Sequence, residues 1–187
     1  MGIVVREKDL EEIEEKLTSM NTDLNKINYL ESALKEQGFS FEIKRFIFEK
    51  LSEYYGGRKM FERAAVAMSN KASLEISSKD RVNSYLNAAE LFSRTGKIDD
   101  AEEMFIRAGR DVSSIEKMKI KLARKNIYMV FAKELEEKGK KVNAAKFYER
   151  LIKMNLEEFE KKEIKEKLLS TYNSLGLFRE AKLIERL

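Results

Sequence analysis

Four of the five basic side chains between residues 117 and 125 have types and a spacing that suit the binding of an anion. We call this set the basic stripe: Lys117, Lys121, Arg124 and Lys125. Their spacing of i, i+4, i+7 and i+8 places them on one face of a helix. A row of cations suits an acidic protein segment, a phosphate backbone or an anionic lipid surface. The alternative is a solvated face, in which basic side chains pair with nearby glutamates, and Lys138, Lys140 and Lys141 at the end of the same predicted helix interact favourably with its dipole.

Charge is distributed unevenly along the chain. Over all 187 residues, Lys and Arg number 37 against 33 Asp and Glu, a net charge of +4. Residues 1–50 are net acidic, whereas residues 101–150 carry thirteen basic and eight acidic side chains. The small overall excess does not by itself indicate nucleic acid. The basic block nevertheless keeps a nucleic-acid partner open beside a protein partner.

Several residue types that enzymes commonly use are missing. The chain has no Cys, which excludes disulfides, thiolate nucleophiles and sulfur-ligated zinc. It has no His, the commonest general base near neutral pH and the imidazole metal ligand. The segment Gly56-Gly57-Arg58-Lys59 lacks the spacing of a phosphate-binding loop and the hydroxyl that follows its Lys. We therefore predict no catalytic residue, no metal site and no cofactor, and we expect a protein that is not an enzyme.

The elements that position these side chains are predicted to be helices throughout. Apolar residues recur with a helical period, the chain contains no Pro, and no segment has a strand pattern. The predicted fold class is all-α. The ten predicted helices lie near residues 7–19, 22–36, 40–55, 59–73, 79–94, 98–110, 113–138, 141–154, 157–175 and 178–187.

Glycines mark the predicted helix ends, and capping residues mark the starts. A Gly stands just after most periodic runs, where a left-handed C-cap belongs. These glycines are Gly38, Gly56, Gly57, Gly96, Gly109, Gly139 and Gly176. The candidate N-caps are Ser40, Asp99, Ser113 and Asn155, the last two with a Glu three residues later.

Three of the glycines belong to an internal repeat. Gly96, Gly139 and Gly176 are each followed five residues later by Ala, and each is preceded four residues earlier by an aromatic residue or Leu. Ala at a helix crossing lets two axes approach closely, and an aromatic side chain from the facing helix fills the space beside it. The repeated positions in the best copy are Ala89, Phe92, Gly96, Ala101, Phe105 and Ala108.

This arrangement resembles the tetratricopeptide repeat, a pair of antiparallel helices with small residues at their crossing. Residues 82–108 match well and residues 125–151 fairly; residues 162–187 match in part, and residues 43–72 hold a degenerate copy. The copies are 37, 43 and 37 residues apart, longer than the family's usual repeat of about 34. The longer spacing is similar to the stretched repeats of the soluble NSF attachment protein branch. The resemblance implies an array of antiparallel helical hairpins that forms a right-handed solenoid.

In tetratricopeptide arrays the first helix of each repeat lines a concave binding groove. The resemblance implies that eight residues face such a groove here: Asn83, Leu86, Asn87, Glu90 and Arg94 from one repeat, and Asn126, Met129 and Lys133 from the next. An Asn amide offers both a donor and an acceptor to the backbone of an extended peptide. The family's carboxylate clamp is not reproduced, because Val130 stands where the clamp has Arg. A structural role explains these Asn residues about as well as a binding role.

The segment 39–61 is unusually aromatic, with seven of the chain's 18 Phe and Tyr residues. A helix that is apolar this far round its circumference is either buried between layers or docked on a partner. Both interpretations stay open at the level of the sequence.

The chain is predicted to form one continuous domain with two parts. Residues 1–37 form an N-terminal helical cap with an acidic opening, and residues 38–187 form the repeat array. No apolar run approaches the roughly 18 residues of a membrane span, and the N-terminus lacks the apolar region of a signal peptide. We therefore expect a cytoplasmic protein.

The predicted function is a non-catalytic scaffold or adaptor. It would bind another protein, or an acidic peptide segment, through the concave groove and the basic stripe. The alternative is a nucleic-acid-binding helical array that uses the basic stripe. The sequence leaves the oligomeric state and the identity of the partner open.

Overall fold

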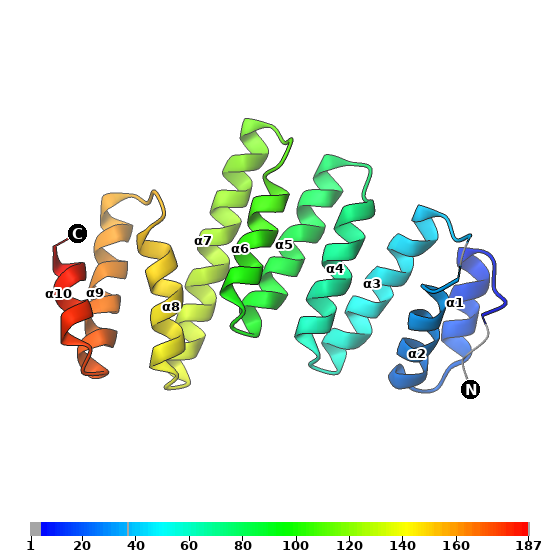
Figure 1. The fold of residues 1–187 in the computed structure, drawn as a ribbon, viewed down its shortest axis with the longest axis horizontal. Helices are drawn as coiled ribbons and strands as arrows, with labels where there is room; N and C mark the ends of the chain where they lie inside the picture. The colour runs from blue at the N-terminus through cyan, green and yellow to red at the C-terminus, as the bar shows by residue number, and fades with distance from the viewer. Residues whose placement is uncertain (1–4, 37, 187) are drawn as a thin grey trace. The chain divides into compact units, whose positions relative to one another are not determined.

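The computed structural model describes residues 5–36 and 38–186. Over these residues it contains ten α-helices and no strand (Figure 1). The helices are α1 (Leu10–Ser19), α2 (Asp23–Ala33), α3 (Phe41–Gly57), α4 (Phe61–Leu74), α5 (Ser78–Arg94), α6 (Ile98–Ala108), α7 (Ser114–Glu137), α8 (Lys141–Ile152), α9 (Glu158–Ser174) and α10 (Phe178–Glu185). The predicted all-α fold class is therefore confirmed, and each observed helix overlaps one predicted range.

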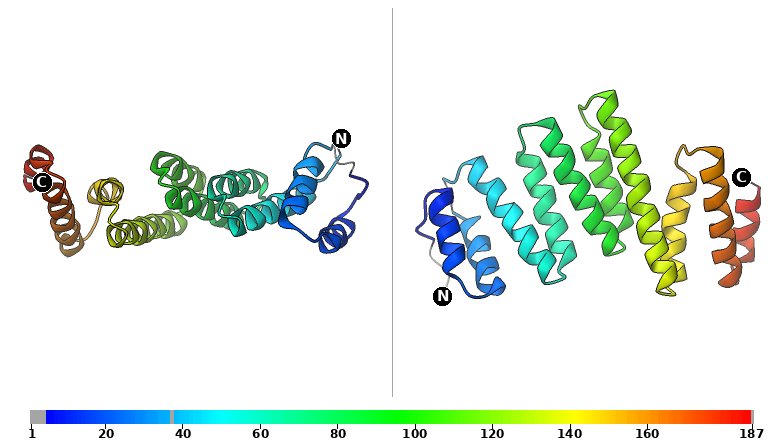
Figure 2. Two further views of the ribbon diagram at one scale, coloured as in Figure 1. Left: turned by 90° about the horizontal axis from the view of Figure 1, so that it is seen from below. Right: turned by 180° about the vertical axis from the view of Figure 1, so that it is seen from behind.

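The chain forms two compact units, residues 1–120 and residues 121–187. In the first unit α2 packs against α3, α3 against α4, α4 against α5, and α5 against α6. In the second unit α9 packs against both α8 and α10. These neighbours also lie side by side in two further views (Figure 2). The predicted cap at residues 1–37 stays a prediction, and Met1 to Val4 and Gln37 lie outside the described residues.

Two of the predicted N-caps are confirmed. Ser40 precedes α3, and its hydroxyl accepts a hydrogen bond from the Ile43 backbone N–H at 3.2 Å. Ser113 precedes α7, and its hydroxyl accepts from the Glu116 N–H at 3.2 Å. The Glu116 carboxylate accepts in return from the Ser113 N–H at 2.9 Å. Each bond satisfies a backbone donor that the first helical turn leaves unpaired.

The other two predicted N-caps are wrong. The cap of α9 is Glu157 rather than Asn155, because Glu157 and Glu160 form the reciprocal capping box two residues later. The cap of α6 is Lys97, so Asp99 lies inside the first turn. In the first turn the Asp99 carboxylate lies near the positive end of the helix dipole, which stabilises it there although it does not cap the helix.

Four turns between helices share one pattern of hydrogen bonds. In each, a backbone N–H donates to the carbonyl five residues earlier: Met60 to Tyr55, Lys97 to Phe92, Lys140 to Leu135 and Leu177 to Tyr172, at 2.8–3.0 Å. This is the 6→1 bond of a Schellman C-cap, which needs a left-handed residue. Gly96, Gly139 and Gly176 fill that position with φ of +78°, +70° and +73°. In the turn after α3 the position belongs to Lys59, at φ +60°.

The predicted glycine caps at two helix ends are therefore corrected. Gly56 and Gly57 lie inside α3, and the left-handed residue follows them at Lys59. Gly109 follows α6 in a right-handed conformation, and Asp111 takes the positive φ instead. In both turns the positive φ is therefore adopted by a residue other than Gly.

The repeated small and aromatic positions of the first unit are buried between helices. Ala88, Ala89 and Phe92 of α5 and Ala101 and Phe105 of α6 are all at most 6% exposed. A second part of this core contains buried residues from each of the four helices α1, α2, α3 and α4. Its buried members are Ile13, Leu17, Ile27, Tyr29, Leu30, Ala33, Ile47, Leu51, Tyr55, Ala64 and Ala67.

The core of the second unit is built around aromatic residues of α7 and α8. Phe147 is fully buried, with its ring centroid 5.4 Å from that of Tyr128 in an edge-on arrangement and 6.2 Å from that of Phe131. The hydroxyl of Tyr148 donates to Glu136 of α7 at 2.6 Å, and Tyr172 of α9 donates to Glu149 at 2.9 Å. These bonds satisfy the polar tips of side chains whose rings are buried.

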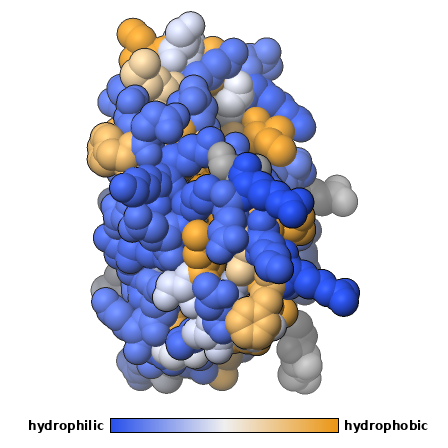
Figure 3. Space-filling view, turned by 90° about the vertical axis from the view of Figure 1, so that its left-hand side faces the viewer, coloured by the Kyte–Doolittle hydropathy of each residue, from blue (hydrophilic) through white to orange (hydrophobic). Residues whose placement is uncertain are grey.

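No helix within the described ranges has the length and apolar character needed to span a lipid bilayer. Across the same residues, no group of three or more Asp and Glu side chains is arranged to hold a metal ion. On the side of the molecule that Figure 3 presents, apolar side chains lie in separate spots among hydrophilic ones.

Candidate binding surfaces

Four of the five predicted groove residues of α5 lie along one exposed face of that helix and form the α5 row, whereas the fifth, Leu86, is partly buried. Asn83, Asn87, Glu90 and Arg94 are all exposed, while the opposite face carries the buried residues of the core. The spacing of four, three and four residues keeps them in line. The local sequence is thus enough to place the row.

Part of the α5 row is already engaged within the protein. The Arg94 guanidinium lies 3.4 Å from the Glu90 carboxylate and 5.2 Å from the centroid of the Phe61 ring. Among the described residues, the side-chain amides of Asn83 and Asn87 have no hydrogen-bond partner. These two amides are therefore the part of the row that is free for a ligand.

The remaining predicted groove residues lie on α7, in the second unit. Asn126 and Lys133 are exposed, and Met129 is partly buried. The two sets of residues thus belong to different units of the chain. A single groove that includes both sets stays a prediction.

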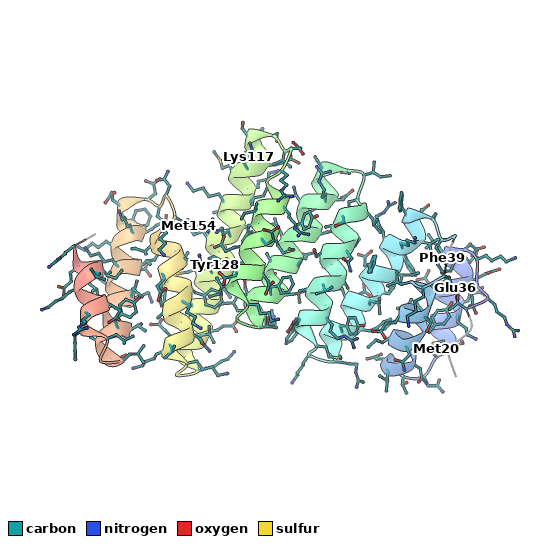
Figure 4. All side chains as sticks on the ribbon, viewed as in Figure 1. Met20, Glu36, Phe39, Lys117, Tyr128 and Met154 are labelled. Atoms are coloured by element: carbon teal, nitrogen blue, oxygen red, sulfur yellow. The ribbon has the colours of Figure 1, made fainter. Side chains whose placement is uncertain are left out.

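The basic stripe is only partly open to a ligand. Lys117 and Lys121 are exposed, and Figure 4 shows Lys117 near the start of α7 and Tyr128 further along it. Lys125 forms an ion pair with Glu160 of α9 at 2.5 Å. Arg124 is partly buried, with its guanidinium 5.8 Å from the centroid of the Tyr128 ring. Two of the four cations are thus committed to contacts within the protein.

A hollow that the sequence did not reveal lies between α2 and α4, over α3. We call it the α2–α4 groove; its volume is about 610 Å³. It is lined by Glu31, Leu34 and Lys35 at the end of α2, by Phe48, Leu51 and Tyr55 of α3, and by Glu62, Arg63, Val66, Ala67 and Asn70 of α4. On each helix every one of these residues lies three or four positions from another, so each helix contributes one face.

The polar end of the α2–α4 groove is a network of three side chains. The Tyr55 hydroxyl donates to the Glu31 carboxylate, and the Arg63 guanidinium donates to the same carboxylate at 3.0 Å. The Arg63 guanidinium also lies 4.9 Å from the centroid of the Tyr55 ring. Burial, together with the bond to Glu31, raises the pKa of Tyr55 to about 12. The network holds the three side chains together at this end of the groove, and the positive charge of Arg63 balances the negative charge of Glu31.

The aromatic segment 39–61 divides between the two interpretations that the sequence left open. Tyr55 is buried in the core and also lines the α2–α4 groove, and Phe48 is a partly buried wall of the groove. Phe41 is 65% exposed at the start of α3. The aromatic content of α3 was therefore the sequence signal for this site, although it did not say which side chains stay uncovered.

No family model and no curated protein matches this chain. The resemblance to the tetratricopeptide repeat therefore stays a prediction from the residues themselves.

Proposed function

We propose that the chain is a non-catalytic scaffold that binds a segment of another protein in the α2–α4 groove. The observation that carries the proposal is the groove itself, an open hollow with apolar walls in a chain without His or Cys. Its volume of about 610 Å³ is within the usual range of ligand sites, roughly 300–1,000 Å³. Apolar walls with a few fixed polar groups are the usual composition of a recognition site.

The same proposal includes the architecture. The helices would form tandem antiparallel hairpins in a right-handed solenoid, as in the tetratricopeptide family. The four turns with the same Schellman bonds support this, because Tyr55, Phe92, Leu135 and Tyr172 occupy the same position before them. The α5 row, above all Asn83 and Asn87, would then supply a second contact surface for an extended segment.

Site-directed photo-crosslinking tests the function. A benzophenone amino acid is placed at Val66, at Asn87 or at Ile106 in the full chain, in the cells that produce it. Val66 is 48% exposed in the groove, and Ile106 of α6 is a matched control at 56% outside it. A scaffold gives a discrete crosslinked protein from Val66 or Asn87 that Ile106 does not give. If all three positions give the same products, or none gives any, the scaffold proposal is wrong.

A second candidate function is nucleic-acid binding by α7. It is favoured by the exposure of Lys117 and Lys121, which leaves two cations one turn apart on the same face. Fluorescence anisotropy with labelled RNA and DNA at low salt tests it. Binding should weaken steeply with salt and fall on Lys117→Glu with Lys121→Glu. Binding that ignores both changes rules out this use of α7.

A further inference from the structure

The carboxylates on the rim of the α2–α4 groove are balanced by cations of the same chain. Glu31 accepts hydrogen bonds from Tyr55 and Arg63. Glu62 forms an ion pair with Lys97, which lies in the turn between α5 and α6. Both rim carboxylates therefore have a partner before any ligand arrives, and neither needs a cation from outside.

Lys35 is the rim charge that remains uncompensated. It is exposed, and among the residues that the structure describes it has no ion-pair partner. A partner with a carboxylate beside Lys35 gains an attraction, whereas a partner with a cation there is repelled. The rim therefore prefers acidic segments to basic ones.

The walls of the groove favour an apolar side chain beside that acid. Leu34, Phe48 and Val66 form an apolar lining, and Val66 is 48% exposed. An apolar side chain that covers these walls is removed from water together with them. The eight residues from Arg63 to Asn70 span about 10 Å of α4. That length accommodates about two turns of a helix or three residues of an extended chain.

We propose that the occupant of the α2–α4 groove is an acidic segment of another protein. It places one bulky apolar side chain against Leu34, Phe48 and Val66, and an Asp or Glu carboxylate beside Lys35. Lys35 is thus the residue that selects acidic over basic partners. This inference rests on the proposed scaffold function and adds the chemistry of the partner.

Selection from a displayed library of random 12-residue peptides against the full chain tests the inference. Enriched peptides should carry a Leu, Ile, Met or Phe together with an Asp or Glu within four positions. Their affinity should fall about tenfold on Lys35→Glu and at least tenfold on Val66→Glu, because each change removes a favourable contact and adds an unfavourable one. The matched controls are Lys79→Glu and Ile106→Glu, both exposed outside the groove, and each should change the affinity less than threefold.

Methyl NMR of the unaltered chain makes the test independent of the variants. The enriched peptide should shift the methyl signals of Leu34, Leu51 and Val66, and circular dichroism checks that each variant keeps its helix content. Peptides that are basic, or that bind equally well to the Lys35→Glu chain, overturn the inference. So do peptides that shift only methyl signals outside the groove.

The outcomes also separate this inference from the scaffold function. If Val66 crosslinks a protein whose binding is unaffected by Lys35→Glu, the scaffold function stands, and the proposal that Lys35 selects an acidic partner is wrong. If the crosslink comes from Asn87 alone, the scaffold binds its partner through the α5 row, and the proposal that an acidic segment occupies the α2–α4 groove is wrong. If neither position crosslinks and no peptide depends on Lys35, both proposals fail.

Discussion

The region around Tyr55 and the region around Tyr148 use the same arrangement of three groups in different surroundings. In each, a buried tyrosine hydroxyl donates to a carboxylate of an earlier helix, Glu31 or Glu136. A cation from a further helix approaches that carboxylate: Arg63 at 3.0 Å from Glu31, and Lys167 at 3.8 Å from Glu136. The local chemistry of the two regions is therefore equivalent.

What differs is the apolar surface beside each tyrosine. Phe147, next to Tyr148, is fully buried, whereas Phe48 is a partly buried wall of the α2–α4 groove and Val66 is half-exposed. One arrangement thus closes a core, and the other borders a hollow. A polar network joins three helices in both regions, and the uncovered apolar residues decide whether those helices offer a surface for binding.

The largest expected effect comes from truncating the two phenylalanines. Phe147→Ala should lower the free energy of unfolding by about 3–5 kcal/mol, because it leaves a cavity in a closed core. Phe48→Ala should lower it by only about 1–2 kcal/mol, because the side chain is partly exposed already. Urea titration followed by circular dichroism measures both. Equal losses at the two positions would contradict the distinction between closed core and open groove.

The next effect concerns the carboxylates that bind the tyrosine hydroxyls. Glu31→Leu and Glu136→Leu each leave a buried hydroxyl without its acceptor and should cost about 1–3 kcal/mol. Adding Tyr55→Phe or Tyr148→Phe removes the orphaned hydroxyl, so each double variant should recover part of the loss. A double-mutant cycle at each site gives the coupling free energy. A coupling near zero at both sites would mean that the hydroxyl bonds do not stabilise the protein.

The raised pKa of Tyr55 predicts a loss of stability in alkali. The folded-state pKa of about 12 lies above the ordinary value of about 10. The stabilisation is therefore complete below pH 10 and disappears as the pH rises from 10 to 12. The stability difference between the unaltered chain and Tyr55→Phe, about 1–2 kcal/mol at pH 8, should shrink over this interval. A difference that is constant from pH 8 to pH 12 would refute the assignment.

The smallest effect concerns one turn beside each region. Gly139→Ala, at φ +70°, should cost about 1 kcal/mol, and a Cβ there meets no atom within 4 Å, so the cost comes from the backbone alone. Lys59→Gly, at φ +60°, should stabilise by about 0.5 kcal/mol by relieving the same strain. Thermal unfolding measures both changes. If Lys59→Gly destabilises the protein, the side chain of Lys59 has a role that outweighs its backbone strain.

Much of the fold was predictable from local sequence. Ser40 and the pair Ser113 and Glu116 were identified as caps because the bonds they make reach only three residues along the chain. Asp99 and Asn155 were misassigned because acids and amides suit both the cap and the first turn, so composition alone does not fix the helix start to the residue. The sequence does not predict the positive φ of Lys59, because residues with a Cβ rarely adopt the left-handed conformation.

The candidate sites were predictable to a lesser extent. The α5 row with Asn83 and Asn87 follows from helical spacing, and the structure places it on an exposed face. The engagement of Lys125 with Glu160 was not predictable, because the two residues are 35 positions apart. The α2–α4 groove was missed for the same reason, since its walls come from three helices.

Helical periodicity, capping and residue type are local properties, so the amino-acid sequence predicts the ten helices of the described residues and excludes His and Cys chemistry. Tertiary packing decides that Phe48 and Val66 border a hollow while Phe147 is sealed in a core, because burial depends on how closely separate helices approach one another. Apolar spacing along one helix marks a face to be covered, but only the packing of α2, α3 and α4 decides how much of that face remains open to a partner.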